Sequence, residues 1–452
     1  MKHIKVLSPT AILGYGFPED SFREGMRRKP DVIACDAGST DPGPYYLGAG
    51  ISFTDRNAVK RDLALILPAA IEAGIPVVIG TAGGSGAKPH VAVTVDIVRE
   101  IAHEQNLHFQ LAVIHSDFSA ESVKTARKEG RLSPLGPAQE VNDADIEACT
   151  HIVGQMGEEP FIKALDEGAQ VILAGRSYDP AEFAAVPIRA GFDRALATHM
   201  GKILECAAIT ALPGSGSDCM FGTLYEDHFV LEPLSPQRQC TTLSVAAHSL
   251  YEKSDPYHLP GPGGAIDLHN TQFEQLDERR VKVSGTRWVA TDNYCVKLEG
   301  ARPVGYRTIS PAATHDPVMI AQIDHIVEQV RLRVDDNFRE ANFGDYFLDF
   351  KIYGKQGVMR LFPNTPASQS DELMIIIEAV AKTQEAANTL CSFARSTLLH
   401  YGYEGRISTA GNLAFPFSPS DCKMGVVYEF GLYHLLEVDS PLTPFPITYE
   451  HL

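Results

Sequence analysis

Pro76-Val-Val-Ile-Gly-Thr-Ala-Gly-Gly-Ser-Gly-Ala-Lys-Pro-His90 is the stretch that decides the fold of this chain. Its apolar run is typical of a strand buried on both faces. The run leads into a glycine-rich turn and then into a segment of helix length, residues 91–105. A strand, a tight turn and a helix in this order predict an α/β unit.

The turn itself contains Gly83, Gly84, Ser85 and Gly86. Glycines let the backbone approach a ligand closely, and the first turn of a helix presents unpaired N–H groups. We therefore expect these four residues to bind an anion or a substrate carboxylate, with a plain strand-to-helix turn as the alternative. Their spacing matches neither the dinucleotide fingerprint GxGxxG nor the P-loop.

The same alternation of strand and helix patterns fills the first half of the chain. Strands are predicted at residues 5–7, 31–36, 76–79, 109–115 and 170–175, and helices at 18–28, 57–73, 91–105, 121–129 and 161–167. This order predicts an α/β fold with a doubly wound, mostly parallel sheet, forming a substrate-binding and catalytic domain over residues 1–215. An α+β arrangement of the same elements is the alternative.

The pattern changes after about Leu212. Strands are predicted at 221–231, 241–248, 281–289 and 294–298, a loop at 256–264, and a helix from Asp316 to Arg333 with aspartate as its N-cap. These elements predict an α+β domain over residues 216–361. A polar linker at 362–371 precedes a strand at 373–380 and a helix at 383–399, which predict a small C-terminal α+β module over 371–452.

The composition limits the classes of partner and compartment. The 452 residues include 57 acidic and 39 basic side chains, for a net charge of −18, and the basic ones form no stripe, which argues against nucleic acid and anionic membranes. The eight cysteines are scattered and form no CxxC pair, and the sequence shows no signal peptide and no apolar run of membrane length. We therefore expect a cytoplasmic protein with reduced thiols. We also expect a homo-oligomer that acts on a small molecule.

Ligands of doubly wound sheets bind at the carboxyl ends of the strands, and each predicted strand here is followed by glycines or ionisable groups. After the second strand, Asp36 could be a general base or a metal ligand, or it could only cap its own loop. Ser39 and Asp41 belong to the same loop and are expected to contact substrate.

His115 and Asp117 follow the fourth strand. A histidine beside a carboxylate suits a general base or two ligands of a divalent metal ion, the one cofactor that the sequence points to. Alternatively, Asp117 together with Ser119 forms the N-cap of the next helix.

Arg176 and Asp179 follow the fifth strand. The planar guanidinium of Arg176 could bind a substrate carboxylate, with Asp179 beside it in the substrate site, or the two could form an ion pair that locks the loop. Lys202 and Glu205 are three residues apart in an apolar helical segment, so they share a face. An acid in such surroundings has a raised pKa and suits proton transfer.

Four further strings resemble the acyclic terpene utilisation (AtuA-like) family. They are Asp36-Ala-Gly-Ser-Thr-Asp-Pro-Gly-Pro-Tyr-Tyr-Leu-Gly48, Ala174-Gly-Arg-Ser-Tyr-Asp-Pro180, Gly201-Lys-Ile-Leu-Glu-Cys-Ala207 and His315-Asp-Pro-Val-Met-Ile-Ala-Gln-Ile-Asp324. The resemblance covers residues 5–355 and implies a role in the catabolism of branched acyl compounds. The last part of the chain, with Ser408-Thr-Ala-Gly-Asn-Leu-Ala-Phe-Pro-Phe417, looks like the small module often encoded beside such proteins.

These observations predict a cytosolic catabolic enzyme for a small carboxylated or hydroxy-acyl substrate, which could be linked to coenzyme A. A lyase of the hydratase or dehydratase kind is the first choice, with Asp36 or His115 as base, Glu205 as acid and Arg176 as anchor. An isomerase or a hydrolase could use the same groups. From a different class, the chain could be a non-catalytic subunit or binding module of a carboxylase or mutase complex.

Overall fold

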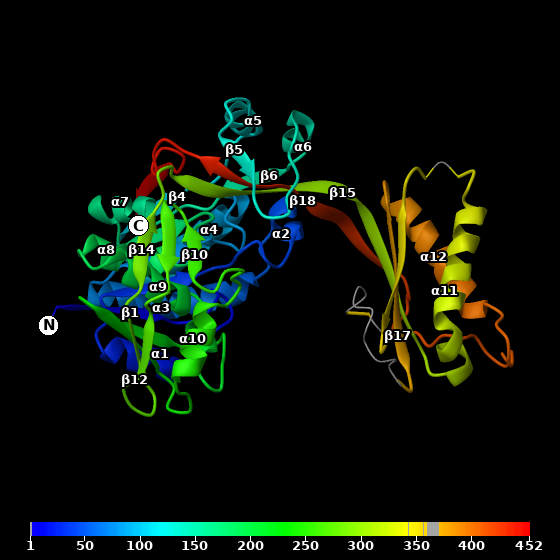
Figure 1. The fold of residues 1–452 in the computed structure, drawn as a ribbon, viewed down its shortest axis with the longest axis horizontal. Helices are drawn as coiled ribbons and strands as arrows, with labels where there is room; N and C mark the ends of the chain where they lie inside the picture. Colours follow the sequence, from blue (N-terminus) through cyan, green and yellow to red (C-terminus); the bar gives the residue numbers. More distant parts are fainter. Residues whose placement is uncertain (1, 342, 356, 359–369) are drawn as a thin grey trace. The chain divides into compact units, whose positions relative to one another are not determined.

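A computed structural model describes residues 2–341, 343–355, 357–358 and 370–452. The chain divides into two compact units (Figure 1). Unit 1 contains Met1–Arg302 and Phe430–Leu452, and unit 2 contains Pro303–Glu429. The predicted boundary at 361 and most of the predicted linker at 362–371 lie outside the described residues.

A large mixed sheet forms the centre of unit 1. Its order among the described residues is β12-β13-β9-β8-β1-β2-β3-β7-β4-β19. The middle strands, β1 (His3–Ser8), β2 (Val32–Asp36), β3 (Val77–Gly80), β7 (Val171–Ala174) and β4 (Gln110–Ile114), are parallel to one another. The flanking strands β8 (Met220–Tyr225), β9 (His228–Pro233), β13 (Val281–Ser284), β12 (Gln272–Gln275) and β19 (Ile447–His451) are paired antiparallel.

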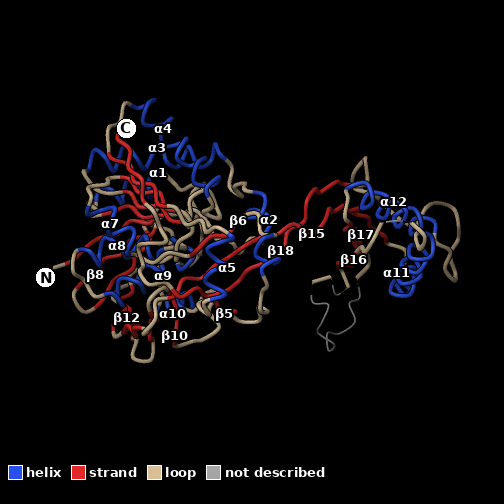
Figure 2. The backbone as a smooth tube through the Cα atoms, turned by 90° about the horizontal axis from the view of Figure 1, so that it is seen from above, coloured by secondary structure: helices blue, strands red, loops and turns tan. Residues whose placement is uncertain are grey.

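Helices cover both faces of the parallel strands, because successive side chains of a strand point to opposite faces. Val78 belongs to one apolar cluster, and its neighbours Val77 and Ile79 belong to another. α7 (Glu159–Asp166), α8 (Ala181–Arg189) and α9 (Arg194–Leu204) pack in the first cluster, and α1 (Glu19–Arg27), α3 (Arg56–Ala73) and α4 (Lys88–Gln105) in the second, on opposite sides of the strands (Figure 2). The predicted α/β fold is confirmed as a mixed α/β unit.

The capping residues explain where these helices begin and end. Asp55 accepts hydrogen bonds from the backbone N–H groups of Asn57 and Ala58 at the start of α3, and Gly74 ends that helix in a left-handed conformation.

The remaining helical segments of unit 1 are α2 (Pro44–Ala49), α5 (Ala120–Lys128), α6 (Asp143–Glu147), the 3₁₀ turn η1 (Ala207–Thr210) and α10 (Thr242–Ser249).

Two predictions for the region after Leu212 are wrong. The predicted strand at 241–248 is the helix α10, which begins with a capping box between Thr241 and Ser244. The predicted loop at 256–264 contains β10 (His258–Gly261), which pairs with β11 (Gly264–Asp267) in a small sheet completed by β14 (Arg287–Ala290). Gly and Pro residues at 260–264 therefore mark a hairpin turn.

Unit 2 (yellow to orange in Figure 1) is built on part of a second sheet. The sheet order is β16 (Phe347–Tyr353), β17 (Leu373–Ala381), β15 (Cys295–Thr314), β18 (Cys422–Glu437) and β5 (Leu132–Pro134), and β6 (His151–Gly154) pairs with β15. α11 (Pro317–Asn337) and α12 (Gln384–His400) share an apolar cluster with β16 and β17. Both helices were predicted, and Asp316 and Thr383 are their N-caps.

The units differ from the predicted domains at 1–215, 216–361 and 371–452. β8 and β9 continue the sheet of the first half of the chain, so the sheet is not complete at residue 215. β17 and α12 share their core with β16 and α11, whereas β19 pairs with β4 in unit 1. Residues 371–452 are thus divided between the two units.

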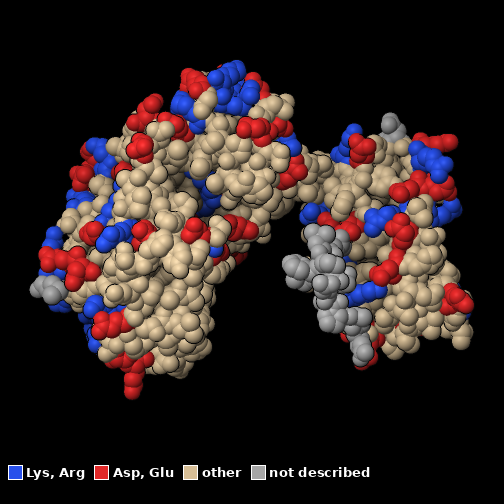
Figure 3. Space-filling model, in the orientation of Figure 1, with Lys and Arg blue, Asp and Glu red and all other residues tan. Residues whose placement is uncertain are grey.

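The surfaces carry both signs of charge. Lys and Arg are interspersed with Asp and Glu on the visible face of each unit (Figure 3). Within the described part of the chain, the helices are too short or too polar to span a bilayer.

Candidate active site

A cleft of about 520 Å³ in unit 1 gathers charged side chains from distant parts of the sequence. They come from the loop after β2, the loop after β7, the end of α9, the segment after α10 and the start of β15. The charged residues that line it are Asp41, Arg176, Asp179, Lys202, Glu205, Glu252, Lys253, Asp255 and Lys297. Five acidic and four basic side chains therefore line one cleft.

Arg176 is the best-connected of these side chains and is only 2% exposed. Its Nε lies 2.8 Å from Glu299 Oε2, and its Nη1 lies 2.7 Å from Asp179 Oδ1. Nη2 donates to no described residue, and Arg176 lines the cleft. The structure thus contains the ion pair to Asp179 and leaves one edge of the guanidinium for a ligand.

Glu299 completes this ion cluster from β15. Its Oε1 accepts from Lys297 Nζ at 2.7 Å and from Thr40 Oγ1 at 2.7 Å. Burial opposes ionisation of Glu299, but Arg176 and Lys297 outweigh it and lower its pKa to about 2. Glu299 is therefore a fixed negative charge that holds the two cations in place.

Glu205 has the properties of a proton donor. Its Oε1 accepts a hydrogen bond from Lys202, while its buried Oε2 has no partner among the described residues. Burial raises the pKa of Glu205 to about 7, with Lys202 opposing the shift and Asp179 adding to it. Near neutral pH, this carboxyl group is partly protonated beside the cleft.

Asp36 and Glu182 are two further buried carboxyl groups that interact with Asp179 and Glu205. Burial, and then repulsion from Asp179, raise the pKa of Asp36 well above its usual range, although Gly38 donates its N–H to Asp36 Oδ1 at 3.2 Å. Burial and repulsion from Asp36 do the same to the pKa of Glu182. Asp36 does not line the cleft.

The glycine-rich turn packs against protein groups. A Cβ at Gly86, whose φ is +70°, would lie 2.1 Å from the backbone N of Arg176, and one at Gly84 would lie 2.8 Å from Phe53 Cδ1. Ser116 Oγ accepts from Arg176 N at 2.7 Å and donates to Gly86 O at 3.0 Å. Gly83, Gly84, Ser85 and Gly86 are buried and do not line the cleft, so the turn holds the backbone of Arg176 in position.

His115 and Asp117 lie apart from Arg176. His115 lines a separate cavity of about 460 Å³, between α4 and β19. Asp117 Oδ1 accepts from Lys88 N at 2.9 Å, at the first residue of α4, and Ser119 is the N-cap of α5. The structure therefore does not bring His115 into the cleft with Arg176, because β4 lies beyond β7 and is followed by β19.

The loop after β2 contributes one of its two predicted residues to the cleft. Asp41 lines it, and Ser39 Oγ donates to Asp41 Oδ2 at 2.9 Å without lining it. Ser39 therefore orients the carboxylate that reaches the ligand space.

Lys253 is the most notable cleft residue that the sequence did not reveal. Its Nζ pairs with no carboxylate of the described residues and lies 5.7 Å from the ring centroid of Tyr178. Burial and repulsion from Lys202 lower the pKa of Lys253. Lys253 lies in the polar stretch Tyr251-Glu-Lys-Ser-Asp255, a composition that is typical of a solvated turn. By contrast, Lys297 and Glu299 occupy alternate positions of an apolar strand, and this pattern was a detectable sign of a buried ion pair.

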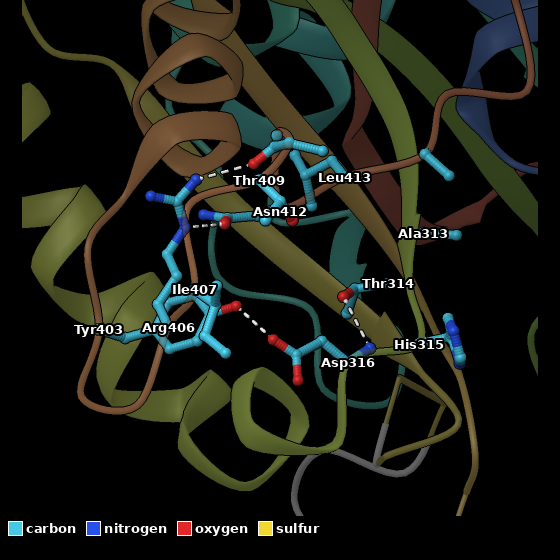
Figure 4. A pocket seen from close by; sticks show the side chains of 13 residues that line it. Ala313, Thr314, His315, Asp316, Tyr403, Arg406, Ile407, Thr409, Asn412 and Leu413 are labelled. Carbon is cyan, nitrogen blue, oxygen red and sulfur yellow. Dashed lines mark hydrogen bonds between the residues drawn. The ribbon is translucent and has the colours of Figure 1, made fainter.

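Unit 2 contains a cavity of its own, of about 320 Å³ (Figure 4). Its polar groups bond mainly to one another: Arg406 Nε donates to Asn412 Oδ1 at 2.6 Å, and Tyr403 OH donates to Asp316 Oδ2 at 2.5 Å. Asp316 also caps α11. Tyr403 thus joins the segment after α12 to the start of α11, and the bond between Arg406 and Asn412 closes a loop within that segment.

Comparison with known proteins gives one family match. The model of the family described as "Acyclic terpene utilisation family protein AtuA" matches residues 55–211 and 229–415. No curated protein and no solved structure matches the chain.

Proposed function

The chain belongs to the acyclic terpene utilisation family AtuA, and from that premise we propose that it is a catabolic enzyme working by acid–base chemistry on a small carboxylated or hydroxy-acyl substrate. Its reaction is the removal or addition of water. Such a lyase needs a base for the proton next to a carbonyl, an acid for the leaving hydroxyl group and an anchor for the negative charge of the substrate.

Glu205 carries this proposal as the general acid. Its pKa of about 7 and its buried, unpartnered Oε2 beside the cleft suit a group that gives a proton to a leaving hydroxyl and then recovers it. Lys202 holds the other carboxyl oxygen and so fixes the direction of Oε2.

Asp179 is the base in this proposal. It lines the cleft, and Arg176 holds one of its oxygens, which leaves the other for the substrate. Asp36 has a raised pKa and does not line the cleft, so it is not the base in this proposal. His115 lines a different cavity.

Lys253 and the free edge of Arg176 are the anchors. Lys253 offers to the cleft an ammonium group that pairs with no carboxylate in the described part of the chain, and Arg176 offers Nη2. Both would bind a carboxylate of the substrate. The negative charge of that carboxylate would raise the pKa of Lys253, whereas burial alone lowers it.

The test is a screen of hydroxy acids and acyl-CoA esters for gain or loss of water, followed by Glu205→Gln. We expect the variant to lower kcat by about 10²–10⁴-fold. In the parent enzyme kcat should fall as the pH rises through about 7, because the acid must be protonated.

Glu158→Gln is the matched control. Burial raises the pKa of Glu158 to about 7 as well, but this carboxyl pairs with Arg194 and does not line the cleft, so activity should persist. Full activity of Glu205→Gln would overturn the assignment. Inactivity on every substrate, together with co-purification of a partner protein, would overturn the proposal that this chain is an enzyme.

A further inference from the structure

We propose that His258, Asp267 and His269 form a binding site for a divalent transition-metal ion such as Zn²⁺, at the rim of the cleft. Each residue offers one ligand atom, and these three atoms lie within 4.8 Å of one another. The inference does not depend on the reaction proposed above. We call the three side chains the His–Asp–His triad.

The hairpin of β10 and β11 brings the triad together. His258 and Asp267 are direct partners across the two antiparallel strands. The next pair, Leu259 and Ile266, is buried against Trp288. Because side chains alternate along a strand, His258 and Asp267 project from the other face, and His269 follows two residues after Asp267.

Neighbouring contacts hold both imidazoles close to the carboxylate. Asp255 Oδ1 accepts from the backbone N–H of His258 at 2.9 Å. The ring of Tyr257 stacks on His269 with a centroid distance of 4.4 Å, and His269 Nδ1 lies 2.7 Å from Asp267 Oδ1. The two histidine rings meet edge to face at 5.1 Å. Little movement is needed to point all three groups at one ion.

Two imidazoles and one carboxylate are a donor set for zinc and related ions. Ligand atoms around a tetrahedral zinc ion are about 3.4 Å apart, so the triad must contract slightly. His258 and His269 are about half exposed, which leaves them free to do so. With three protein ligands, the ion would keep a position for an oxygen of a small molecule, and His258 itself lines the cleft.

The alternative is a histidine–carboxylate hydrogen bond with no ion. The chain contains a matched example of it in Asp227 and His228, whose Oδ1 and Nδ1 also lie 2.7 Å apart. Among the described residues, no third metal-ligand atom lies close to Asp227 and His228. The triad is the one group of three such atoms in the described part of the chain. His228→Ala is therefore the control for the loss of one histidine that pairs with a carboxylate.

The experiment is a titration of the metal-stripped full chain with Co²⁺, followed by visible absorption, and a competition with Zn²⁺. We expect one equivalent to bind, with affinity lowered at least about tenfold by His258→Ala and by His269→Ala, and unchanged by His228→Ala. Circular dichroism of each variant checks that it is folded. Failure of the parent chain to bind one equivalent, or unaltered binding by either triad variant, would overturn the site.

Discussion

Glu299 is a carboxylate without exposed surface, held between Arg176, Lys297 and Thr40. The sequence predicted an ion pair of Arg176 with Asp179, three residues away, as one of two alternatives. It did not predict the pair with Glu299, which lies 123 residues from Arg176, because such a contact depends on the path of β15. Removing one partner of a buried ion cluster leaves the others uncompensated.

Glu299→Gln should destabilise the protein, and more so at neutral pH than in acid. A fall of the Glu299 pKa from 4.5 to about 2 corresponds to about 3 kcal/mol of unfolding free energy. Because the pKa is lower in the folded state, this stability is present above pH 4.5 and is lost as the pH falls toward 2.

Urea denaturation of parent and variant at pH 7 and pH 3 measures the effect. The difference between them should be about 3 kcal/mol at pH 7 and about half of that or less at pH 3. Glu450→Gln, which removes an exposed partner of Arg99, should change little at either pH. An equal difference at both pH values would contradict the shifted pKa.

At the scale of elements, periodic segments with clear caps could be predicted and hairpin-rich segments could not. Asp316 before Pro317 located α11 correctly, and the buried runs located β3 and β7. The segment 241–248 was predicted as a strand, but the capping box of Thr241 and Ser244 begins a helix there. Arg176 and Asp179 line the cleft from the loop after β7 and Glu205 lines it from the end of α9, whereas Lys253 reaches it through a turn with no periodic pattern.

Thr241→Ala should therefore cost about 1 kcal/mol of stability, because Thr241 Oγ1 accepts the backbone N–H of Ser244 at 3.1 Å. Thermal or urea unfolding measures the loss. Thr241→Asn retains a capping oxygen and should restore most of it. If Thr241→Ala and the neighbouring Thr242→Ala lowered the free energy of unfolding equally, the Thr241 cap would make no specific contribution to stability.

At the scale of the molecule, the chain leaves unit 1 after Arg302 and re-enters it at Phe430. The returning segment ends in β19, which pairs with β4 and covers the edge of the large sheet. No local pattern predicts this pairing, because the alternation that identifies a strand does not identify its partner. The predicted three-domain division followed sequence order and so missed the return.

Deleting Ile447–Leu452 should expose the apolar edge strand β4 and cause self-association, since an unpaired edge is a template for other strands. Size-exclusion chromatography with light scattering compares the deletion with the parent chain. Glu450→Ala keeps the backbone of β19 while removing the pair with Arg99, and it should elute like the parent. A deletion variant of unchanged size and melting temperature would contradict this role of β19.

The pairing of β4 with β19 also fixes an order of events during synthesis. Val113 and Thr448, partners in these strands, are 335 residues apart. At a translation rate of about 5–20 residues per second, roughly 20–70 seconds separate their appearance from the ribosome. During that interval the nascent sheet has an open side, and neighbouring nascent chains on one messenger RNA carry the same open side. Slow codons or a bound chaperone between these strands would therefore change the yield of native protein without altering any contact of the final fold.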